Sequence, residues 1–294
     1  MIRRSEEEMM SLILDFARED ARVRAVWMNG SRANPNAPRD RWQDFDIVCA
    51  VTDMASFLVN DGWVDRFGPR VIMQTRRDQV ESDEETDFSD WFIYLMQFSD
   101  GNRIDLSLVP LERAEAAFLE DRMCVPLLDK DGRLPAIPPS TDEDYWVKPP
   151  TARQFHNCCN EFRWVSTYVA KGIWRKELPY AHEMLDHYTR EALVQMLEWE
   201  AGVRTDFLLS TGKCGKYLER CLPAEDWALY RRTYCGSEYE EIWDALFAMH
   251  QLFARSSRFV ASAFGFPIDT DEEKRVLAYL SGEVSGQSPS DPLR

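Results

Sequence analysis

The sequence predicts an α+β fold, in which a small mixed sheet with flanking helices precedes an α-helical bundle. Up to about residue 135, short apolar runs alternate with stretches of helical periodicity. Beyond Thr151 the apolar residues recur at steps of three and four, which is typical of helices alone. Five prolines separate the two patterns and mark a linker: Pro135, Pro138, Pro139, Pro149 and Pro150.

Two domains are expected, at 1–140 and 141–280, because 294 residues exceed what a single core usually holds. The residues after 280 are rich in Gly, Ser and Pro, so 281–294 is predicted to be a disordered tail.

The first domain is expected to begin with a helix over 5–20, where Leu12, Ile13 and Phe16 recur at helical spacing among charged residues. Short apolar runs then predict strands at 25–29 and 45–51, a helix at 54–61 and a further strand at 70–74.

A β-hairpin is predicted next, with strands at 91–98 and 103–109. Its turn is the sequence Ser99-Asp100-Gly101-Asn102, a strong hairpin signal. Alternation along the second strand places Asp105 on its polar face, together with Arg103 and Ser107. The domain is expected to end with a helix at 111–120 and a strand at 125–128.

The second domain is predicted to be helical throughout. Phe155, Cys159 and Phe162 begin the apolar series of its first helix. The remaining helices are expected at 179–200, 213–221, 224–234, 237–264 and 271–280.

The chain is strongly acidic, with a formal charge of −16 from 35 basic and 51 acidic residues. A nucleic-acid partner is disfavoured, because phosphate backbones bind basic surfaces. A cationic substrate would be attracted, although the acidity could equally serve solubility alone. The acidic run at 81–90 is predicted to be a solvated loop. The alternative is that it lies at the rim of a pocket and attracts a cation.

The sequence indicates neither a membrane protein nor a protein stabilised by disulfide bonds. No apolar run is long enough to span a bilayer, and the N-terminus lacks the apolar core of a signal peptide, so we expect a cytoplasmic protein. The seven cysteines include no Cys-x-x-Cys pair, which favours buried free thiols over disulfides or a zinc site.

The most informative stretch is Gly30-Ser31 followed by Asp44 and Asp46. Glycine allows a sharp turn and a close backbone approach to a ligand, and the serine offers a hydroxyl to a phosphate. Two aspartates two residues apart on a strand face the same way and suit Mg²⁺. If the strand of Asp105 neighbours this one, three carboxylates converge beside the turn. A metal–nucleotide site is therefore predicted, although each motif alone is also common in ordinary turns.

These motifs resemble those of the nucleotidyltransferases related to DNA polymerase β, and most closely the aminoglycoside 6-adenylyltransferases, which modify streptomycin. The resemblance covers about residues 5–280. The segments that carry it are 27–34, 43–48, 100–106, 172–175, 178–181, 184–186, 212–218 and 239–243.

The resemblance implies transfer of AMP from Mg–ATP to a substrate hydroxyl in bacterial antibiotic resistance. It implies that Asp44 and Asp46 hold Mg²⁺, and that Asp105 is a general base or a further metal ligand. The nucleotide phosphates would be contacted from both domains, by Asn29, Gly30, Ser31, Arg32, Lys213, Lys216 and Tyr217.

Streptomycin is cationic, so carboxylates with aromatic neighbours would recognise it. The candidate substrate residues are Trp91, Tyr94, Trp174, Glu177, Tyr180, His182, Glu183 and Asp186. For the aromatic residues core packing is the alternative, and for His182 an ordinary helix position.

The expected partners are ATP and a cationic aminoglycoside, and a monomer is expected. Three alternatives remain open: a nucleotidyltransferase of the same fold acting on another small molecule or a protein hydroxyl, a non-catalytic nucleotide-binding module, and a haloacid-type phosphatase. The last also uses Asp-x-Asp, but the Gly30-Ser31 turn and the lysines of the second domain disfavour it.

Overall fold

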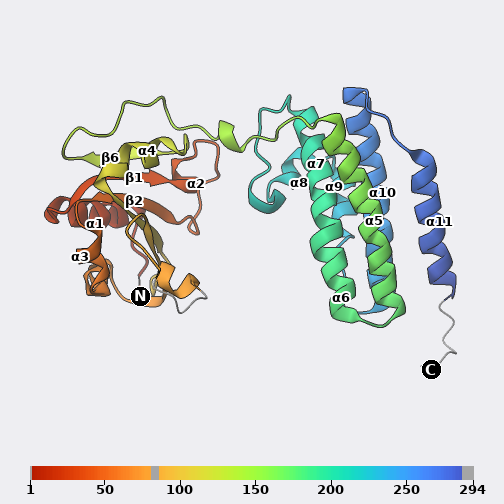
Figure 1. Cartoon of the computed structure of the whole chain (residues 1–294), viewed down its shortest axis with the longest axis horizontal. Helices are drawn as coiled ribbons and strands as arrows, with labels where there is room; N and C mark the ends of the chain where they lie inside the picture. The colour runs from red at the N-terminus through yellow and green to blue at the C-terminus, as the bar shows by residue number, and fades with distance from the viewer. Residues whose placement is uncertain (1, 81–85, 287–294) are drawn as a thin grey trace. The chain divides into compact units, whose positions relative to one another are not determined.

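A computed structural model of the chain describes residues 2–80 and 86–286, and the chain divides into two compact units (Figure 1). The first unit ends at Asp144 and the second begins at Tyr145, within the proline-containing segment. Each unit has its own hydrophobic core.

The first unit is built on one six-stranded mixed sheet, which confirms the predicted fold class. The strand order is β3-β4-β5-β2-β1-β6, so β2 and β5 lie at the centre. These two are parallel, whereas every other neighbouring pair is antiparallel. The strands are β1 Val23–Asn29, β2 Phe45–Val51, β3 Arg70–Thr75, β4 Phe92–Phe98, β5 Arg103–Pro110 and β6 Val125–Asp129.

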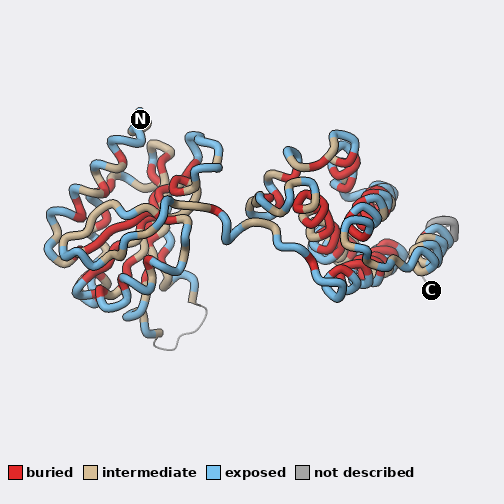
Figure 2. Tube along the Cα trace, turned by 90° about the horizontal axis from the view of Figure 1, so that it is seen from above, coloured by how far each residue is buried: buried red, intermediate tan, exposed pale blue. Residues whose placement is uncertain are grey.

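Both faces of this sheet are covered, because the strands alternate two sets of apolar residues. Val26 and Met28 face a core that includes residues of helices α1 (Glu6–Glu19) and α3 (Met54–Leu58). Trp27 faces the other way, where its ring packs edge-on against Phe118 of α4 (Ala114–Leu119). Figure 2 shows the buried residues in the interior of this unit.

The N-terminus of α1 is held by a capping box. The Ser5 hydroxyl accepts from the Glu8 backbone N–H, and the Glu8 carboxylate accepts from the Ser5 N–H. Short 3₁₀ turns occur at Asp61–Phe67, Arg76–Gln79, Leu111–Arg113 and Glu143–Tyr145.

The second unit is the predicted bundle of helices. Long helices α5, α7 and α10 pack on one another and bury a continuous apolar core (Figures 1 and 2). In that core the Phe162 ring stacks on Phe253 with 3.9 Å between ring centroids. The helices are α5 Ala152–Trp174, α6 Leu178–His182, α7 Arg190–Arg204, α8 Leu218–Cys221, α9 Ala224–Arg231, α10 Tyr239–Phe264 and α11 Thr270–Gly286.

The helix predicted at 179–200 contains an irregularity that its periodicity does not reveal. A π-helical segment, Glu183–Thr189, joins α6 to α7. The Thr189 hydroxyl donates to the Met184 carbonyl at 2.8 Å and supports the widened turn. Such π-helical turns are frequent at functional sites.

The chain after 280 differs from the prediction. Helix α11 continues through Gly286, because Ser and Gly lower helix propensity without ending a helix by themselves. The rest of the predicted tail lies outside the described residues, as do 81–85 of the acidic run. All seven cysteines are free, and four of them are buried (Cys49, Cys124, Cys158 and Cys159). Within the described ranges, no helix combines the length and apolar character needed to cross a bilayer.

Candidate functional site

Three carboxylates converge at one edge of the central strand pair. Strands β2 and β5 run parallel with Asp46 opposite Asp105, and Asp44 directly precedes β2. One oxygen from each of these three aspartates lies within 4.8 Å of the others. The sequence left it as a condition that the strand of Asp105 neighbours that of Asp46; the structure meets this condition, and the three carboxylates lie together.

The carboxylates repel one another in a partly desolvated setting. Burial, followed by repulsion from Asp105 and Asp44, raises the pKa of Asp46 to about 7. Burial also raises the pKa of Asp44, although the nearby Arg103 guanidinium opposes the shift. A hard divalent cation would relieve this repulsion, and carboxylate oxygens are the ligands that Mg²⁺ prefers.

Gly30 brings the backbone directly against this cluster. It has a φ of +71°, and a Cβ at this position would lie 1.9 Å from Asp46 Oδ2. Only glycine meets both conditions without strain. Gly30 begins the four-residue helix α2 (Gly30–Ala33), and Gln43 Nε2 donates to the Ser31 backbone carbonyl at 3.2 Å.

Asn29 lies on the neighbouring strand, opposite Asp46 in the register of β1 and β2. Its side-chain oxygen is buried and has no hydrogen-bond partner among the described residues. A buried polar atom without a partner is costly unless a ligand or water satisfies it. Asn29 therefore fits its predicted place at the edge of a ligand site.

A family model described as streptomycin adenylyltransferase matches residues 3–282 of the chain. The chain belongs to this family. It is 39% identical over 280 residues to an aminoglycoside 6-adenylyltransferase of Bacillus subtilis (strain 168), a match that covers 95% of this chain and 98% of the relative. It is 40% identical over 272 residues to an aminoglycoside 6-adenylyltransferase of Campylobacter jejuni, covering 92% and 93%.

A crystal structure of an aminoglycoside 6-adenyltransferase from Bacillus subtilis is also similar, with 36% sequence identity, a TM-score of 0.47, and coverage of 96% of this chain and 99% of that one. The family model and the two relatives confirm the family resemblance stated from the motifs, and they confirm the prediction that the chain is an enzyme.

In this member of the streptomycin adenylyltransferase family, the Arg32 guanidinium lacks the free donors that the predicted phosphate contact needs. Its guanidinium is buried and donates to the backbone carbonyls of Asp44 and Gln43, both at 2.9 Å. It also pairs with Glu6 at 2.7 Å and covers the Phe45 ring at 3.9 Å from its centroid. Each guanidinium nitrogen of Arg32 therefore has a partner within the chain. These contacts hold the start of β2 in place, and they leave no guanidinium nitrogen available to phosphates.

Arg103 is a site residue that sequence reasoning missed. Its guanidinium makes two 2.7 Å hydrogen bonds to Asp105 and approaches Asp44 at 3.6 Å. The signal was present, because alternation along β5 places Arg103 and Asp105 on one face.

The two aromatic candidates of the first unit differ in position. Tyr94 is fully buried, and its hydroxyl donates to Asp61 at 2.9 Å, so the predicted role in substrate binding is wrong. It belongs to the core because it lies on the same buried face of β4 as Phe92 and Met96. Trp91 directly precedes β4 and is half-buried, with the Arg76 guanidinium over its ring.

The candidates of the helical unit gather around α6 and the π-helical segment. His182 Nδ1 lies 2.8 Å from Asp186, which also accepts from Arg190 at 2.7 Å, so both Asp186 oxygens have partners. Glu177, Tyr180 and Glu183 belong to the same stretch, and Trp174, at the end of α5, is 63% exposed.

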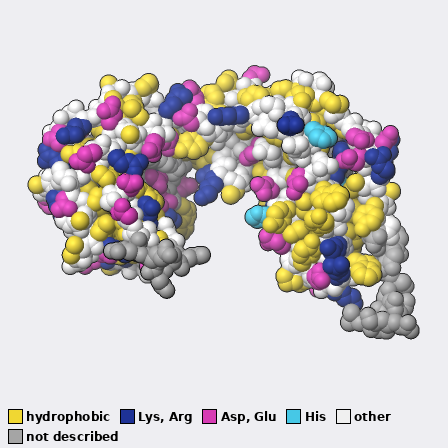
Figure 3. Space-filling model, in the orientation of Figure 1, with side chains coloured by type: hydrophobic (Ala, Val, Ile, Leu, Met, Phe, Trp, Pro, Cys, Tyr) yellow, Lys and Arg dark blue, Asp and Glu magenta, His cyan; other side chains and the backbone are white. Residues whose placement is uncertain are grey.

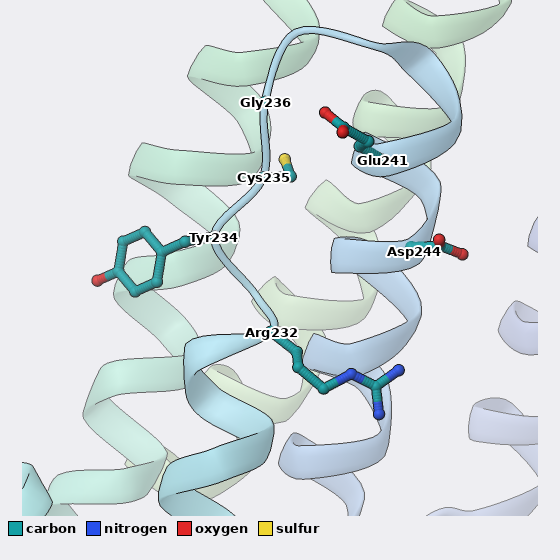
Figure 4. A pocket seen from close by; sticks show the side chains of 6 residues that line it. All are labelled: Arg232, Tyr234, Cys235, Gly236, Glu241 and Asp244. Carbon is teal, nitrogen blue, oxygen red and sulfur yellow. The ribbon is translucent and has the colours of Figure 1, made fainter.

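A pocket of about 460 Å³ adjoins this stretch in the helical unit (Figure 4). Gly236, whose carbonyl lies 3.1 Å from His182 Nε2, forms part of its lining. Figure 4 shows Glu241 and Asp244 on one helix beside it, and neither has an ion-pair partner among the described residues. Sequence reasoning did not assign these two, although their spacing of three places them on one face of α10.

The predicted phosphate ligands of the helical unit lie in one loop. Lys213 and Lys216 are exposed, and the Lys216 ammonium lies 5.1 Å from the centroid of the Tyr217 ring. Their role stays a prediction. In the view of Figure 3, acidic and basic side chains are interspersed over the first unit, while the helical unit shows a broad hydrophobic area with acidic side chains beside it.

Proposed function

We propose that the chain transfers AMP from Mg–ATP to the 6-hydroxyl of streptomycin and releases pyrophosphate. The observation that carries this proposal is the convergence of Asp44, Asp46 and Asp105 directly against the Gly30 turn. The family membership supports the reaction class, and the family's description and the names of the relatives favour an aminoglycoside acceptor.

The residues present fit a magnesium ion. Three carboxylates within 4.8 Å of one another supply hard oxygen ligands, and their repulsion favours an added positive charge. Asp44 and Asp46 would hold the ion. When bound, it would neutralise charge that develops on the phosphates.

The chain's own residues would position the reactants. In the proposed step the acceptor hydroxyl oxygen forms a bond to the α-phosphorus while the bond to the β-phosphate oxygen breaks. The hydroxyl proton passes to the Asp105 carboxylate, unless Asp105 serves as a further metal ligand. The backbone at Gly30 and Ser31 would hold the β- and γ-phosphates, and most of the acceleration would come from positioning and electrostatics.

A cationic acceptor suits the acidic side chains of the helical unit. Glu241 and Asp244 are exposed beside the pocket, and Glu183 is exposed on the π-helical segment. Carboxylates bind guanidinium groups by paired hydrogen bonds. The remaining expectations, a monomer in the cytoplasm, are tested by analytical ultracentrifugation and by cell fractionation.

The decisive experiment measures pyrophosphate release and product mass with Mg²⁺, ATP and a panel of aminoglycosides and lincosamides. Streptomycin is expected to gain one AMP, and NMR of the product should place it on the 6-hydroxyl. Asp44→Asn should abolish transfer, whereas Asp15→Asn, an exposed position on α1, should leave it unchanged. Transfer to another acceptor would overturn the substrate assignment alone, and ATP binding without turnover would indicate a binding module.

A further inference from the structure

Arg103 lies directly beside the carboxylate cluster. It begins β5, two residues before Asp105 and on the same face of the strand. Nε donates to Asp105 Oδ1 and a terminal nitrogen donates to Oδ2, each at 2.7 Å. The same Nε lies 3.6 Å from Asp44 Oδ2. One cation therefore contacts two of the three carboxylates that would bind a metal.

This contact competes with a divalent cation in two ways. Both Asp105 oxygens already accept charge-assisted hydrogen bonds in the paired geometry that arginine and carboxylate favour. The guanidinium also places a positive charge where a second cation would have to approach. A free metal ion must therefore weaken this pair or bind beside it.

The Arg103 side chain is free to change partners. It is 40% exposed, and its hydrogen bonds in the structure are those to Asp105. A phosphate offers a guanidinium the same paired geometry as a carboxylate, so the exchange would leave no buried donor unpaired. Arg32, by contrast, is 6% exposed and held by two backbone carbonyls, which makes the same exchange costly.

We infer that Arg103 makes the cluster a poor site for a free divalent cation and a good one for a metal–nucleotide. When a metal–nucleotide binds, the metal replaces the guanidinium beside Asp105, and the nucleotide phosphates become the new hydrogen-bond partners of the guanidinium. Arg103 is thus a positioning residue that couples metal binding to nucleotide binding. This inference rests on the proposed use of Mg–ATP.

The test measures metal and nucleotide binding separately, without any acceptor. Mn²⁺ serves as the metal probe, and its free concentration is followed by electron paramagnetic resonance in nucleotide-free protein. Arg103→Gln is expected to bind Mn²⁺ on the order of tenfold more tightly than the unaltered chain. It should bind ATP, titrated calorimetrically in EDTA, on the order of tenfold more weakly.

Arg113→Gln is the matched control. Arg113 is 48% exposed and pairs with Asp90 at 3.4 Å in the same unit, so the substitution removes the same charge from a similar setting. It should leave both affinities unchanged. Arg103→Lys keeps the positive charge but cannot make the two parallel hydrogen bonds of a guanidinium, so it should bind Mn²⁺ a few-fold more tightly than the unaltered chain. This variant provides the readout if Arg103→Gln does not fold.

Equal or weaker Mn²⁺ binding by Arg103→Gln or by Arg103→Lys overturns the inference, because Arg103 would then merely orient Asp105. If the unaltered chain binds Mn²⁺ and ATP but transfers AMP to no acceptor, the proposed function fails, and the inference is still decided by the Mn²⁺ affinities of Arg103→Gln and Arg103→Lys. If neither ligand binds to any variant, both fail.

Discussion

Two buried ionisable groups, one in each unit, are accommodated in different ways. In the first unit, Asp46 is held beside Asp44 and Asp105, and burial with their repulsion raises its pKa to about 7. In the helical unit, burial lowers the pKa of His250 to about 3, so that its ring stays neutral. Two further charged groups of that unit, Arg163 and Glu200, are mostly buried but paired with Glu272 and Arg204 at 2.9 and 2.7 Å. Asp46 therefore keeps a repulsion among three carboxylates that a metal ion would relieve, whereas Arg163 and Glu200 are each offset by an opposite charge, as expected where a metal site opposes stability.

The largest expected effect comes from removing this repulsion. Asp46→Asn should lower AMP transfer by about 10³-fold or more, because a metal ligand and its charge are lost. The same substitution should raise the melting temperature at pH 8 in EDTA. A raised carboxyl pKa costs stability above about pH 7 and costs nothing below the unfolded value near 3.8, so the gain should fade as the pH approaches 4.

Calorimetry at both pH values measures this prediction, with Asp15→Asn as a control that changes one exposed charge. A melting temperature for Asp46→Asn that falls at pH 8 would show that the cluster stabilises the fold and would remove the contrast between the units.

In the helical unit, by contrast, substitution of a buried residue should lower stability and leave metal binding intact. Phe162 is 1% exposed and stacked on Phe253, so Phe162→Ala should cost about 3–5 kcal/mol of unfolding free energy. Urea titration followed by circular dichroism measures the loss. Mn²⁺ binding below the transition should be retained, because the carboxylates are placed by β2 and β5. Phe259→Ala, at a 36% exposed position of α10, should cost about 1 kcal/mol or less.

The extent to which the sequence predicts the structure also differs between parts of the molecule. Local patterns were sufficient for the strands of the first unit, for the turn at Gly101 and for the alternation that puts Asp105 on a polar face. The parallel pairing of β2 with β5 is a contact between distant segments, and it entered only as a condition. That pairing decides whether the carboxylates meet.

The wrong assignments concern partners that lie far away in the sequence. Arg32 neighbours Gly30 and Ser31, yet its guanidinium bonds are made to Gln43, Asp44 and Glu6. Tyr94 could have been placed correctly, since the two-residue spacing of a strand puts it on one face of β4 with the apolar Phe92 and Met96. The π-helical segment at Glu183–Thr189 could not, because its sequence keeps the apolar spacing of an α-helix.

The contact between the Gly30 turn and Asp46 can be broken without touching a charge. Gly30→Ala introduces a Cβ 1.9 Å from Asp46 Oδ2 at a φ of +71°. Gly132→Ala has a similar φ of +63° and meets no atom within 4 Å. Both should lose about 1 kcal/mol of stability from the left-handed backbone. Only Gly30→Ala should also lose about 100-fold in AMP transfer, since the carboxylate must shift.

Steady-state rates and melting temperatures of the two alanine variants separate these terms. Equal rates in both variants would show that the close approach of Gly30 to Asp46 has no part in catalysis.

The smallest expected effect tests whether His250 stays neutral inside the helical unit. His250 lies against the Phe162 ring at 4.9 Å between centroids, and its Nε2 has no hydrogen-bond partner in the structure. Because burial, followed by Arg163, lowers the folded pKa below the unfolded value of 6.5, its contribution to stability is complete above pH 6.5 and is lost as the pH falls. Between pH 6.5 and 5 the loss should be about 2 kcal/mol.

The quantity to measure is the difference in unfolding free energy between the unaltered chain and His250→Gln, by urea titration at several pH values. This difference should decrease by about 2 kcal/mol on acidification from pH 6.5 to 5, because the glutamine cannot take up a proton. His156→Gln, at an exposed position of α5, should follow the unaltered chain across the same range. Parallel curves for the unaltered chain and His250→Gln would mean that the imidazole accepts a proton inside the bundle, and the contrast with Asp46 would then rest on the paired groups alone.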